Sequence, residues 1–572
     1  LAEKGDLEAH EPEAPHAHTQ HHDHGHHHRG GDGFRLADPH KLKQVARILE
    51  IEPEGKSLAE LAGLVGEKLS GEFGRQRGEM VLPHRAPMPR VAIWKRLGLM
   101  PRGVDREIVD SLHRTNMGVD NDYRTLIMGA LRTAIADGWG GSMIATELTD
   151  ILLGTPHPIR SRVNLGVLKE DCINIVAHGH EPLLTESMVQ ATRDPELLAK
   201  AREAGAQGIN LAGMCCTSNE VLMRYGVPVA GNFLQQELAV LTGAVEAMVV
   251  DVQCIMSSLP DIAECFHTEV ISTSPLAHFA KAKHVELDIR DPRAAAREIV
   301  ERAIERYPHR DPAKVHIPDE AVDLVAGFSY ESLFHIMGGR YRSTYRPLND
   351  GIITGRLRGV AGVVGCNNLK VEADSFHNAL VRELISRDVM VVQTGCSAIA
   401  CGKSGFLKPE AALEHAGPGL REICEATGLP PVLMAGSCVD NSRILMALTE
   451  MVREGGIGED ISELPVAGAA PEWVSEKALA IGYYFVASGV FTVFGGGQPI
   501  TGSKALVDFV TGELEGLLGG RFAFSNDPRE MAALMIEHIM KKRKALGLRD
   551  LMYARAHEPL EVPTAEEYIP VG

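Results

Sequence analysis

The chain of 572 residues has no cysteine before Cys172, and its ten cysteines include no Cys-X-X-Cys pair. The missing pairs exclude the local signature of a zinc ribbon or a ferredoxin-type cluster. No apolar run approaches the roughly 18 residues of a membrane span, and no tripartite start marks a signal peptide. We therefore expect a cytoplasmic protein without a membrane span, whose cysteines are free thiols or metal ligands.

Basic and aromatic residues are both scarce. Lys and Arg number 58 against 76 Asp and Glu, the formal net charge is −18, and aromatic residues make up 5% of the chain. The negative charge argues against a nucleic-acid or anionic-membrane partner. The length allows about three or four domains.

The N-terminal part divides into a His-rich segment and a helical region. Ten of the 25 histidines lie in residues 1–41, which predicts a flexible segment, either a solvated linker or a loose metal-gathering tail. Residues 42–157 are predicted to form a mainly helical domain. The helix that opens it has Asp38 as its cap and Pro39 in its first turn.

From about residue 160, short apolar runs alternate with amphipathic helices. This alternation predicts parallel sheets flanked by helices. A proline-rich stretch at 307–321 indicates a joint between two such units. The predicted fold class is therefore α/β, with the helical domain followed by two Rossmann-like domains at 158–300 and 301–572.

Six of the apolar runs end in a thiol or an imidazole, often directly after a glycine. In open parallel sheets, ligands bind beyond the carboxyl ends of the strands. One buried cysteine is ordinary packing, but five at strand ends with a histidine at a sixth predict a shared metal site. Adjacent residues of a strand point apart, so only one of the first cysteine pair is expected to ligate. The runs end at His178 and His180, Cys215 and Cys216, Cys254, Cys366, Cys396, and Cys438.

The number of donors restricts the metal. Five thiolates and one imidazole exceed the four ligands of a cubane or of a tetrahedral zinc ion. A larger iron–sulfur assembly with an extra metal would use six, and these donors suit iron and nickel. Cys172, Cys265, Cys401 and Cys424 do not end apolar runs and are interpreted as ordinary thiols.

Several motifs together resemble the active-site motifs of the anaerobic nickel–iron–sulfur carbon monoxide dehydrogenases. They are HGHEP, GMCCTSNEVLMRYG, VVGCNNLK, QTGC and GSCVDNSR, and the likeness extends from about residue 40 to the C-terminus. The resemblance implies a helical domain and two Rossmann-like domains, in a homodimer. It implies the reversible reaction of CO and water to CO2, two protons and two electrons, with a ferredoxin-type electron acceptor.

The resemblance also assigns ligand roles at a Ni-4Fe-4S-type cluster. One metal would be an iron outside the cubane, three would be cubane irons, and one would be nickel. The implied ligands are His180 and Cys216 for the outer iron, Cys254, Cys366 and Cys396 for the cubane, and Cys438 for nickel.

Three further residues are implied around the cluster. WVSEKALAIG resembles the segment that carries the family's catalytic lysine, which makes Lys477 the candidate, although a lone helical lysine is otherwise a surface charge. Its ammonium would stabilise a developing carboxylate. Ile481, one turn on, would wall the gas pocket, and Asp137 would pair with Lys477.

The chain departs from the family upstream of the helical region. The family carries cysteines there for two further cubanes, and this chain has none before Cys172. Additional 4Fe-4S clusters are expected only if a segment precedes Leu1, and without a relay we expect slow turnover. His21, His24 and His27 match the family's proton-transfer histidines only superficially, and an insertion is favoured.

Two alternative functions remain open. One is a hybrid-cluster redox enzyme of the hydroxylamine-reductase type, although that family uses carboxylate ligands where this chain has Cys216 and Lys477. The other is a cluster-bearing, non-catalytic subunit that has lost its electron relay. Nickel analysis separates the first alternative, and CO-dependent dye reduction separates the second.

Overall fold

The computed structural model describes residues 36–338, 343–497 and 499–553. The His-rich segment therefore lies almost wholly outside the described residues. Within these ranges, no helix is both long and apolar enough to cross a membrane.

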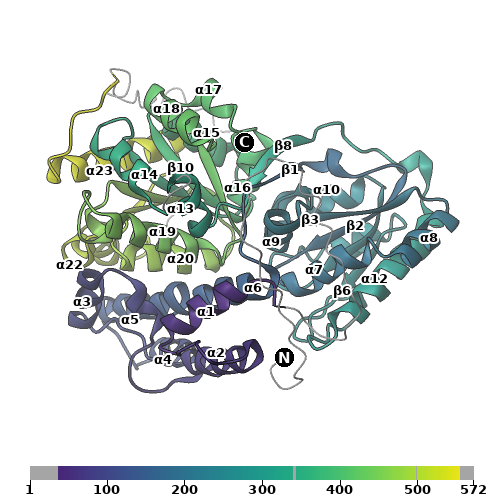
Figure 1. The fold of residues 1–572 in the computed structure, drawn as a ribbon, viewed down its shortest axis with the longest axis horizontal. Coiled ribbons are helices and arrows are strands. Elements are labelled where there is room, and N and C mark those ends of the chain that lie inside the picture. The colour runs from purple at the N-terminus through teal and green to yellow at the C-terminus, as the bar shows by residue number, and fades with distance from the viewer. Residues whose placement is uncertain (1–35, 339–342, 498, 554–572) are drawn as a thin grey trace.

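Six helices form the N-terminal region, which Figure 1 shows in purple along the lower edge of the molecule. The Asp38 side chain accepts a hydrogen bond from the Lys41 N–H, so the predicted cap of the first helix is confirmed. The helices are α1 (Pro39–Ile48), α2 (Leu58–Gly74), α3 (Met88–Arg96), α4 (Val104–Arg114), α5 (Tyr123–Ala136) and α6 (Ser142–Leu153).

A single π-helical turn, η3 (Asp137–Gly141), joins α5 to α6. Such turns insert one extra residue into a helix and are frequent at functional sites. Gly138 is required in this turn, because a Cβ there would lie 2.4 Å from the ring of Tyr484. The turn thus packs directly against the helix that carries Tyr484.

The first sheet has eight strands in the order β7-β6-β5-β2-β3-β4-β1-β8. All neighbouring pairs are parallel except β1 and β8, which are antiparallel. The strands are β1 (Ile159–Val163), β2 (Cys172–His178), β3 (Gly208–Met214), β4 (Val229–Gly231), β5 (Val245–Val250), β6 (Glu269–Ser272), β7 (Lys283–His284) and β8 (Val322–Ala326). The helices among them are α7 (Pro182–Ala191), α8 (Pro195–Glu203), α9 (Cys215–Tyr225), α10 (Gln236–Leu241), α11 (Leu259–Ala263) and α12 (Pro292–Arg306).

The second sheet has six strands, all parallel, in the order β11-β10-β9-β12-β13-β14. The strands are β9 (Gly359–Val363), β10 (Val389–Thr394), β11 (Val432–Gly436), β12 (Val466–Ala470), β13 (Thr492–Phe494) and β14 (Phe522–Phe524). The accompanying helices are α13 (Tyr330–Gly338), α14 (Arg346–Ile353), α15 (Ser375–Ser386), α16 (Gly395–Lys403), α17 (Ala411–His415), α18 (Pro418–Thr427), α19 (Asn441–Glu454), α20 (Glu476–Ala487), α21 (Lys504–Asp508), α22 (Leu514–Leu518) and α23 (Pro528–Ala545).

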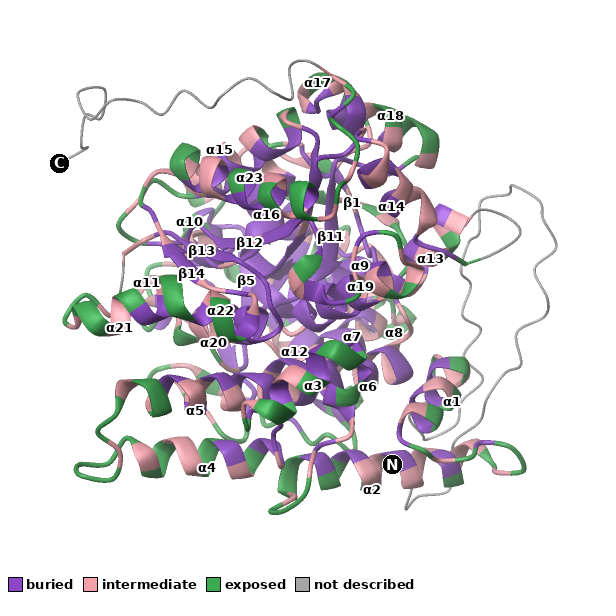
Figure 2. Cartoon of the chain, turned by 90° about the vertical axis from the view of Figure 1, so that its left-hand side faces the viewer, coloured by how far each residue is buried: buried purple, intermediate pink, exposed green. Residues whose placement is uncertain are grey.

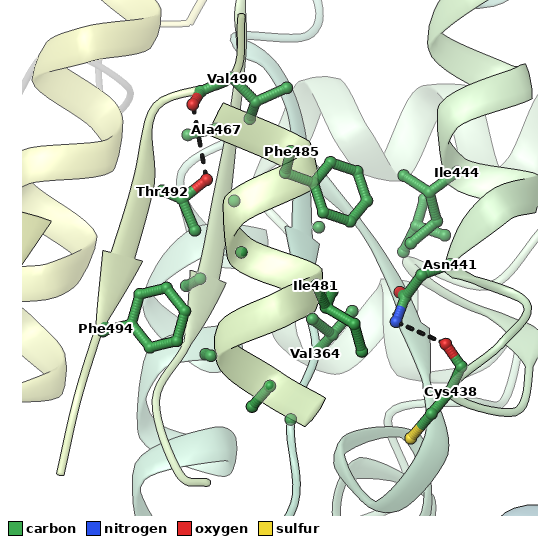
Figure 3. Close-up of a pocket in the computed structure, with 18 of the residues that line it drawn as sticks. Val364, Cys438, Asn441, Ile444, Ala467, Ile481, Phe485, Val490, Thr492 and Phe494 are labelled. Carbon is green, nitrogen blue, oxygen red and sulfur yellow. Dashed lines mark hydrogen bonds between the residues drawn. The ribbon is translucent and has the colours of Figure 1, made fainter. Parts of the chain in front are cut away.

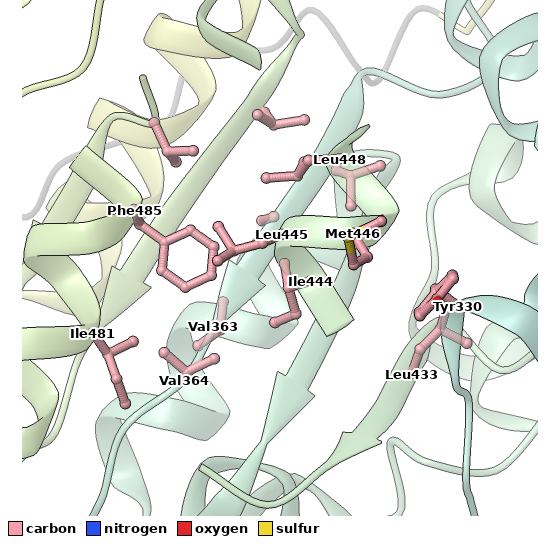
Figure 4. Packing of buried hydrophobic residues seen from close by; sticks show 14 of the residues in the cluster. Tyr330, Val363, Val364, Leu433, Ile444, Leu445, Met446, Leu448, Ile481 and Phe485 are labelled. Carbon is pink, nitrogen blue, oxygen red and sulfur yellow. The ribbon is translucent and has the colours of Figure 1, made fainter. Parts of the chain in front are cut away.

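The strands lie deep in the molecule. Figure 2 shows buried residues along the sheets and exposed ones on the outer helix faces. All six residues of β5 are buried, as expected of a parallel strand that is covered on both faces. In Figure 4, Phe485 and Ile481 of α20 face Val364 and Ile444 across the core of the second sheet. This packing fixes α20 against α19 near the carboxyl ends of the strands.

The predicted fold class is confirmed: a helical region is followed by two units with parallel sheets. One feature was not anticipated. β8 lies beyond the predicted boundary at residue 300, yet it closes the first sheet as an antiparallel edge strand. The boundaries of the His-rich, helical and Rossmann-like domains stay predictions.

Candidate metal centre

The predicted ligands of the first sheet follow three neighbouring strands, β5, β2 and β3. His180 lies two residues after β2, and Cys216 lies in the first turn of α9, directly after β3. Cys254 lies four residues after β5, in a loop. Because these strands are parallel neighbours, their carboxyl ends bring the three side chains to one edge of the sheet.

The second sheet repeats this arrangement with β11, β10 and β9. Cys366 lies three residues after β9, Cys396 is the second residue of α16 after β10, and Cys438 lies two residues after β11. All three thiols are buried. The two sheets therefore each present three predicted ligands from three adjacent strands.

The two sets of ligands meet. The Sγ atoms of Cys216 and Cys438, from different sheets, are 3.2 Å apart. Lys477 of α20 places its Nζ 2.7 Å from Nε2 of His180. Cys254 and Cys366 lie close enough to Lys477 to raise the pKa of the same ammonium. Cys396 lies within electrostatic range of Cys366. The structure thus brings five of the six side chains together around Lys477, with Cys396 beside Cys366.

The ring of His180 has a defined tautomer. Its Nδ1 is 2.9 Å from the Val252 carbonyl oxygen, which can only accept, so Nδ1 carries the proton. Nε2 then presents a lone pair, to which the Lys477 ammonium donates. A hydrogen bond to a carbonyl at one ring nitrogen is the usual way to orient a histidine that binds metal through the other.

Asp251 holds the loops that carry His180 and Cys254. Its carboxylate accepts hydrogen bonds from the backbone N–H groups of His180 at 2.7 Å and of Glu181 at 2.9 Å. Gly179, with φ +135°, makes this approach possible, because a Cβ there would overlap the Asp251 carboxylate. Sequence reasoning missed Asp251, although an acidic residue directly after the run AMVV was a signal for it.

The backbone is strained beside two of the thiols. Gln253 and Cys254 have φ values of 60° and 58°, and Cys215 has 58°. The left-handed conformation costs a residue with a Cβ roughly 1–2 kcal/mol. Strain of this kind persists only where the surroundings enforce it, and it clusters at functional sites. These positions are therefore held for their side-chain placement.

Cys215 departs from the prediction that adjacent residues point apart. Both cysteines belong to α9 rather than to β3, so the alternation of a strand does not apply to them. The Cys396 thiol, together with burial, raises the pKa of Cys215 well above its usual value, while Cys216 contacts Cys438. Both thiols of the pair therefore border the group of predicted ligands.

The electrostatics of the site are dominated by crowded thiols and one cation. The hydrogen bond with Cys216, together with burial, raises the pKa of Cys438 well above its usual value. Burial and the neighbouring thiols raise the pKa of Cys366 to about 12. Burial by itself would lower the pKa of Lys477, but the neighbouring cysteines raise it overall. Burial and mutual repulsion disfavour the thiolate forms of these cysteines, which a bound positive group would stabilise.

Asp137 lies near Lys477 without contacting it. Its carboxylate accepts a hydrogen bond from Ser142 at 2.9 Å, and among the described residues no ion pair joins it to Lys477. Burial raises the pKa of Asp137, and the charge of Lys477 acts in the opposite direction. Pairing of Asp137 with Lys477 stays a prediction.

An apolar cavity reaches the thiols from the second sheet. Ile481 lines it together with Cys366, Cys438 and Lys477. Figure 3 shows Ile481, Ile444 and Phe485 around this space, with Cys438 at one end. Most of the remaining lining comes from aliphatic and aromatic side chains. The cavity therefore suits a small apolar molecule.

The donor set fits a cluster better than a single ion. Among the described residues, no group of three or more His, Cys, Asp or Glu side chains is placed to hold a metal ion. The six predicted ligands instead come from two opposed sheet edges, and they outnumber the four positions of a tetrahedral ion. Five soft thiols and one oriented imidazole match the donors that iron–sulfur and nickel sites use.

Comparison with known proteins identifies the class. The model of the prismane/CO dehydrogenase family matches residues 9–529, and the chain belongs to this family. Carbon monoxide dehydrogenase 1 of Methanosarcina mazei is 53% identical over 90% of this chain and 81% of that protein. The family resemblance and the enzyme class predicted from the motifs are thus confirmed.

Solved structures agree with this assignment. The as-isolated, nickel-free carbon monoxide dehydrogenase of Thermococcus sp. AM4 is 47% identical with a TM-score of 0.88, over 90% of this chain and 80% of that one. Carbon monoxide dehydrogenase IV of Carboxydothermus hydrogenoformans is 45% identical with the same TM-score, over 91% and 83% of the two chains. The described fold is therefore that of these enzymes.

Proposed function

We propose that the chain catalyses the reversible oxidation of CO with water to CO2, two protons and two electrons. The observation that carries the proposal is the gathering of four thiols and one imidazole around one lysine, with a fifth thiol beside them, from six parallel strands of two sheets. The relatives named carbon monoxide dehydrogenase support the same reaction.

A Ni-4Fe-4S-type cluster is the proposed cofactor. The proposed ligands are His180 and Cys216 for an iron outside the cubane, Cys254, Cys366 and Cys396 for the cubane, and Cys438 for nickel. Such a cluster, when bound, supplies a site for CO, an acidified water and storage for two electrons.

Lys477 is the proposed electrostatic and proton-handling residue. Its ammonium is half-buried and lies 2.7 Å from His180 Nε2, at the centre of the thiols. A cation fixed there stabilises negative charge that develops on a carboxylate oxygen, and it needs no reorganisation to do so. The neighbouring cysteines raise the pKa of Lys477, so the amine stays positively charged.

The apolar cavity is proposed as the site that CO occupies before it reacts. Ile481 separates the space beside Cys438 from the core of the second sheet (Figure 3). Lining of this kind admits a small apolar gas more readily than water, which would lose hydrogen bonds there. The wall therefore favours CO over bulk solvent beside the thiols.

The cellular setting belongs to the same proposal. The cysteines of the described chain are free, which fits a reducing compartment, and we propose a cytoplasmic location. The proposed partners are a second copy of the chain in a homodimer and a ferredoxin-type electron acceptor.

The test is CO-dependent reduction of a viologen dye by the isolated chain, with nickel and iron quantified per chain. Cys438→Ala should lose nickel and CO oxidation while it retains much of the iron. Cys424→Ala is the matched control, because it removes a buried thiol that is not one of the proposed ligands. Equal loss of both metals in Cys438→Ala would make Cys438 a general anchor. An unaltered chain that binds iron but no nickel, and reduces hydroxylamine, would favour the hybrid-cluster alternative.

A further inference from the structure

A buried carboxylate joins the three parts of the fold beneath the thiols. Asp150 of α6 is fully buried, and its two oxygens accept hydrogen bonds from Arg443 Nη1 and Nη2 at 2.8 and 2.7 Å. Its Oδ1 also accepts from Arg224 Nη2 at 2.7 Å. The side chains of Arg224 and Arg443 are only 3% and 1% exposed. Asp150 therefore holds two arginines that are almost completely removed from water.

Each arginine belongs to a helix that starts at a proposed ligand. Arg224 lies on α9, whose first turn contains Cys216. Arg443 lies on α19, which begins three residues after Cys438. Asp150 itself belongs to the N-terminal helices, so a single carboxylate ties the ligand-bearing helices of both sheets to a third element. The thiols of Cys216 and Cys438 themselves are 3.2 Å apart.

Further hydrogen bonds hold Arg224 and Arg443 in place. Arg224 Nη1 is 2.6 Å from Glu220 Oε2, one turn back on α9. Arg443 Nε is 3.1 Å from Asp440 Oδ1, and Asp440 accepts a hydrogen bond from the backbone N–H of Ser437 at 2.8 Å. Each guanidinium is thus anchored twice, once to its own segment and once to Asp150. Movement of either helix start must break a charge-assisted hydrogen bond.

We propose that Asp150 is a positioning residue that sets the spacing between Cys216 and Cys438 and thereby the retention of nickel. The inference rests on the proposed function, since it takes Cys438 as the nickel ligand. Asp150 touches neither thiol and acts through Arg224 and Arg443. Without its negative charge, two buried guanidiniums that now share one oxygen repel each other, which drives α9 and α19 apart.

The chain contains a matched ion pair that does not lead to the thiols. Arg90 of α3 is fully buried and binds Asp460, which lies in the loop before residues 461–463. Arg90 Nη1 also donates to the Leu518 carbonyl at 2.7 Å. This pair joins the N-terminal helices to the second sheet, as Asp150 does, but none of its contacts belongs to α9 or α19. Loss of Asp460 therefore costs a comparable buried ion pair away from the proposed ligands.

The experiment compares Asp150→Asn with Asp460→Asn in the full chain, produced with excess nickel. Thermal midpoint, iron per chain and the nickel-to-iron ratio are measured for each. We expect both midpoints to fall, while only Asp150→Asn lowers the nickel-to-iron ratio, by about tenfold, as for the loss of an outer partner of a metal ligand. If Asp150→Asn is insoluble, Arg443→Lys decides by the same ratio, because it keeps the charge but loses the two-point hydrogen bond to Asp150.

The outcomes separate this inference from the proposed function. An unaltered chain that binds iron but no nickel would refute the nickel site itself. A chain that binds nickel, with the same ratio in both variants, would overturn the positioning role and leave the site intact. A nickel loss of equal size in Asp460→Asn would also overturn it, because the effect would then be one of general stability.

Discussion

Gly395 offers a way to displace one proposed ligand without replacing it. It opens α16 with φ +59°, directly before Cys396. A Cβ at this position would lie 2.7 Å from the Sγ of Cys438 and 3.9 Å from that of Cys216. Gly395→Ala therefore places one methyl group against the sulfur that we propose binds nickel.

The size of the effect follows from these distances. Heavy atoms in contact rest at about 3.5 Å or more, so the Cys438 sulfur must shift by roughly 0.8 Å or the loop must open. The positive φ adds about 1 kcal/mol of strain for any residue with a Cβ. A misplacement near 1 Å costs on the order of 100-fold in rate where geometry is critical. We expect Gly395→Ala to lose about that factor in CO oxidation per chain, together with nickel.

Gly428→Ala is the control for the strain. Gly428 caps α18 with φ +73°, and a Cβ there would meet nothing within 4 Å. Both variants carry the same conformational cost, but only one touches a proposed ligand. Dye reduction, metal content and thermal midpoint are measured on both. Activity and nickel content in Gly395→Ala equal to those of Gly428→Ala would refute the claim that the position of the Cys438 sulfur matters.

Two further predictions concern a lysine and a histidine. Lys477→Ala should keep its metals but slow turnover about 100-fold at matched metal content, as for the loss of one hydrogen-bond donor directed at the reacting group. The control is Lys504→Ala, which removes an exposed lysine. Near-normal rates in Lys477→Ala would mean that Lys477 is only a surface charge. His538 is buried against Phe491, and burial lowers its pKa to about 3. The unfolded chain therefore takes up a proton below about pH 6.5 that the folded chain excludes, which costs about 1.4 kcal/mol at pH 5.5. His538→Phe should flatten the pH dependence of the urea midpoint between pH 6.5 and 5.5, and an unchanged slope would contradict the assignment.

The strand-end pattern carried most of the sequence prediction. A parallel strand buried on both faces reads as a continuous apolar run, so its carboxyl end is visible in the sequence as the first polar or thiol residue. This located Cys366, Cys396 and Cys438 within three residues of the ends of their strands. Helix caps were equally readable, since the predicted cap Asp38 accepts a hydrogen bond from the Lys41 N–H at the start of α1. Both signals are local.

The features that sequence reasoning missed depend on distant contacts. β8 pairs with β1 across more than 150 residues, and a short edge strand has no local signature of direction. Asp150 meets Arg443 across 293 residues, and nothing in the run ELTDILL distinguishes this carboxylate from a solvated one. The expectation for Cys215 assumed strand alternation, whereas α9 already begins at this residue; whether Cys215 ligates stays a prediction. Such contacts emerge only once the sheets are assembled.

The division of the proposed ligands between two sheets has a consequence for biosynthesis. His180, Cys216 and Cys254 leave the ribosome first, and Cys438 follows the last of them by 184 residues. A cluster bound by all six residues therefore cannot be completed on the nascent first sheet, however well that sheet folds. With the proposed ligand set, the cluster can be completed only after the second sheet has been synthesised and has packed against the first.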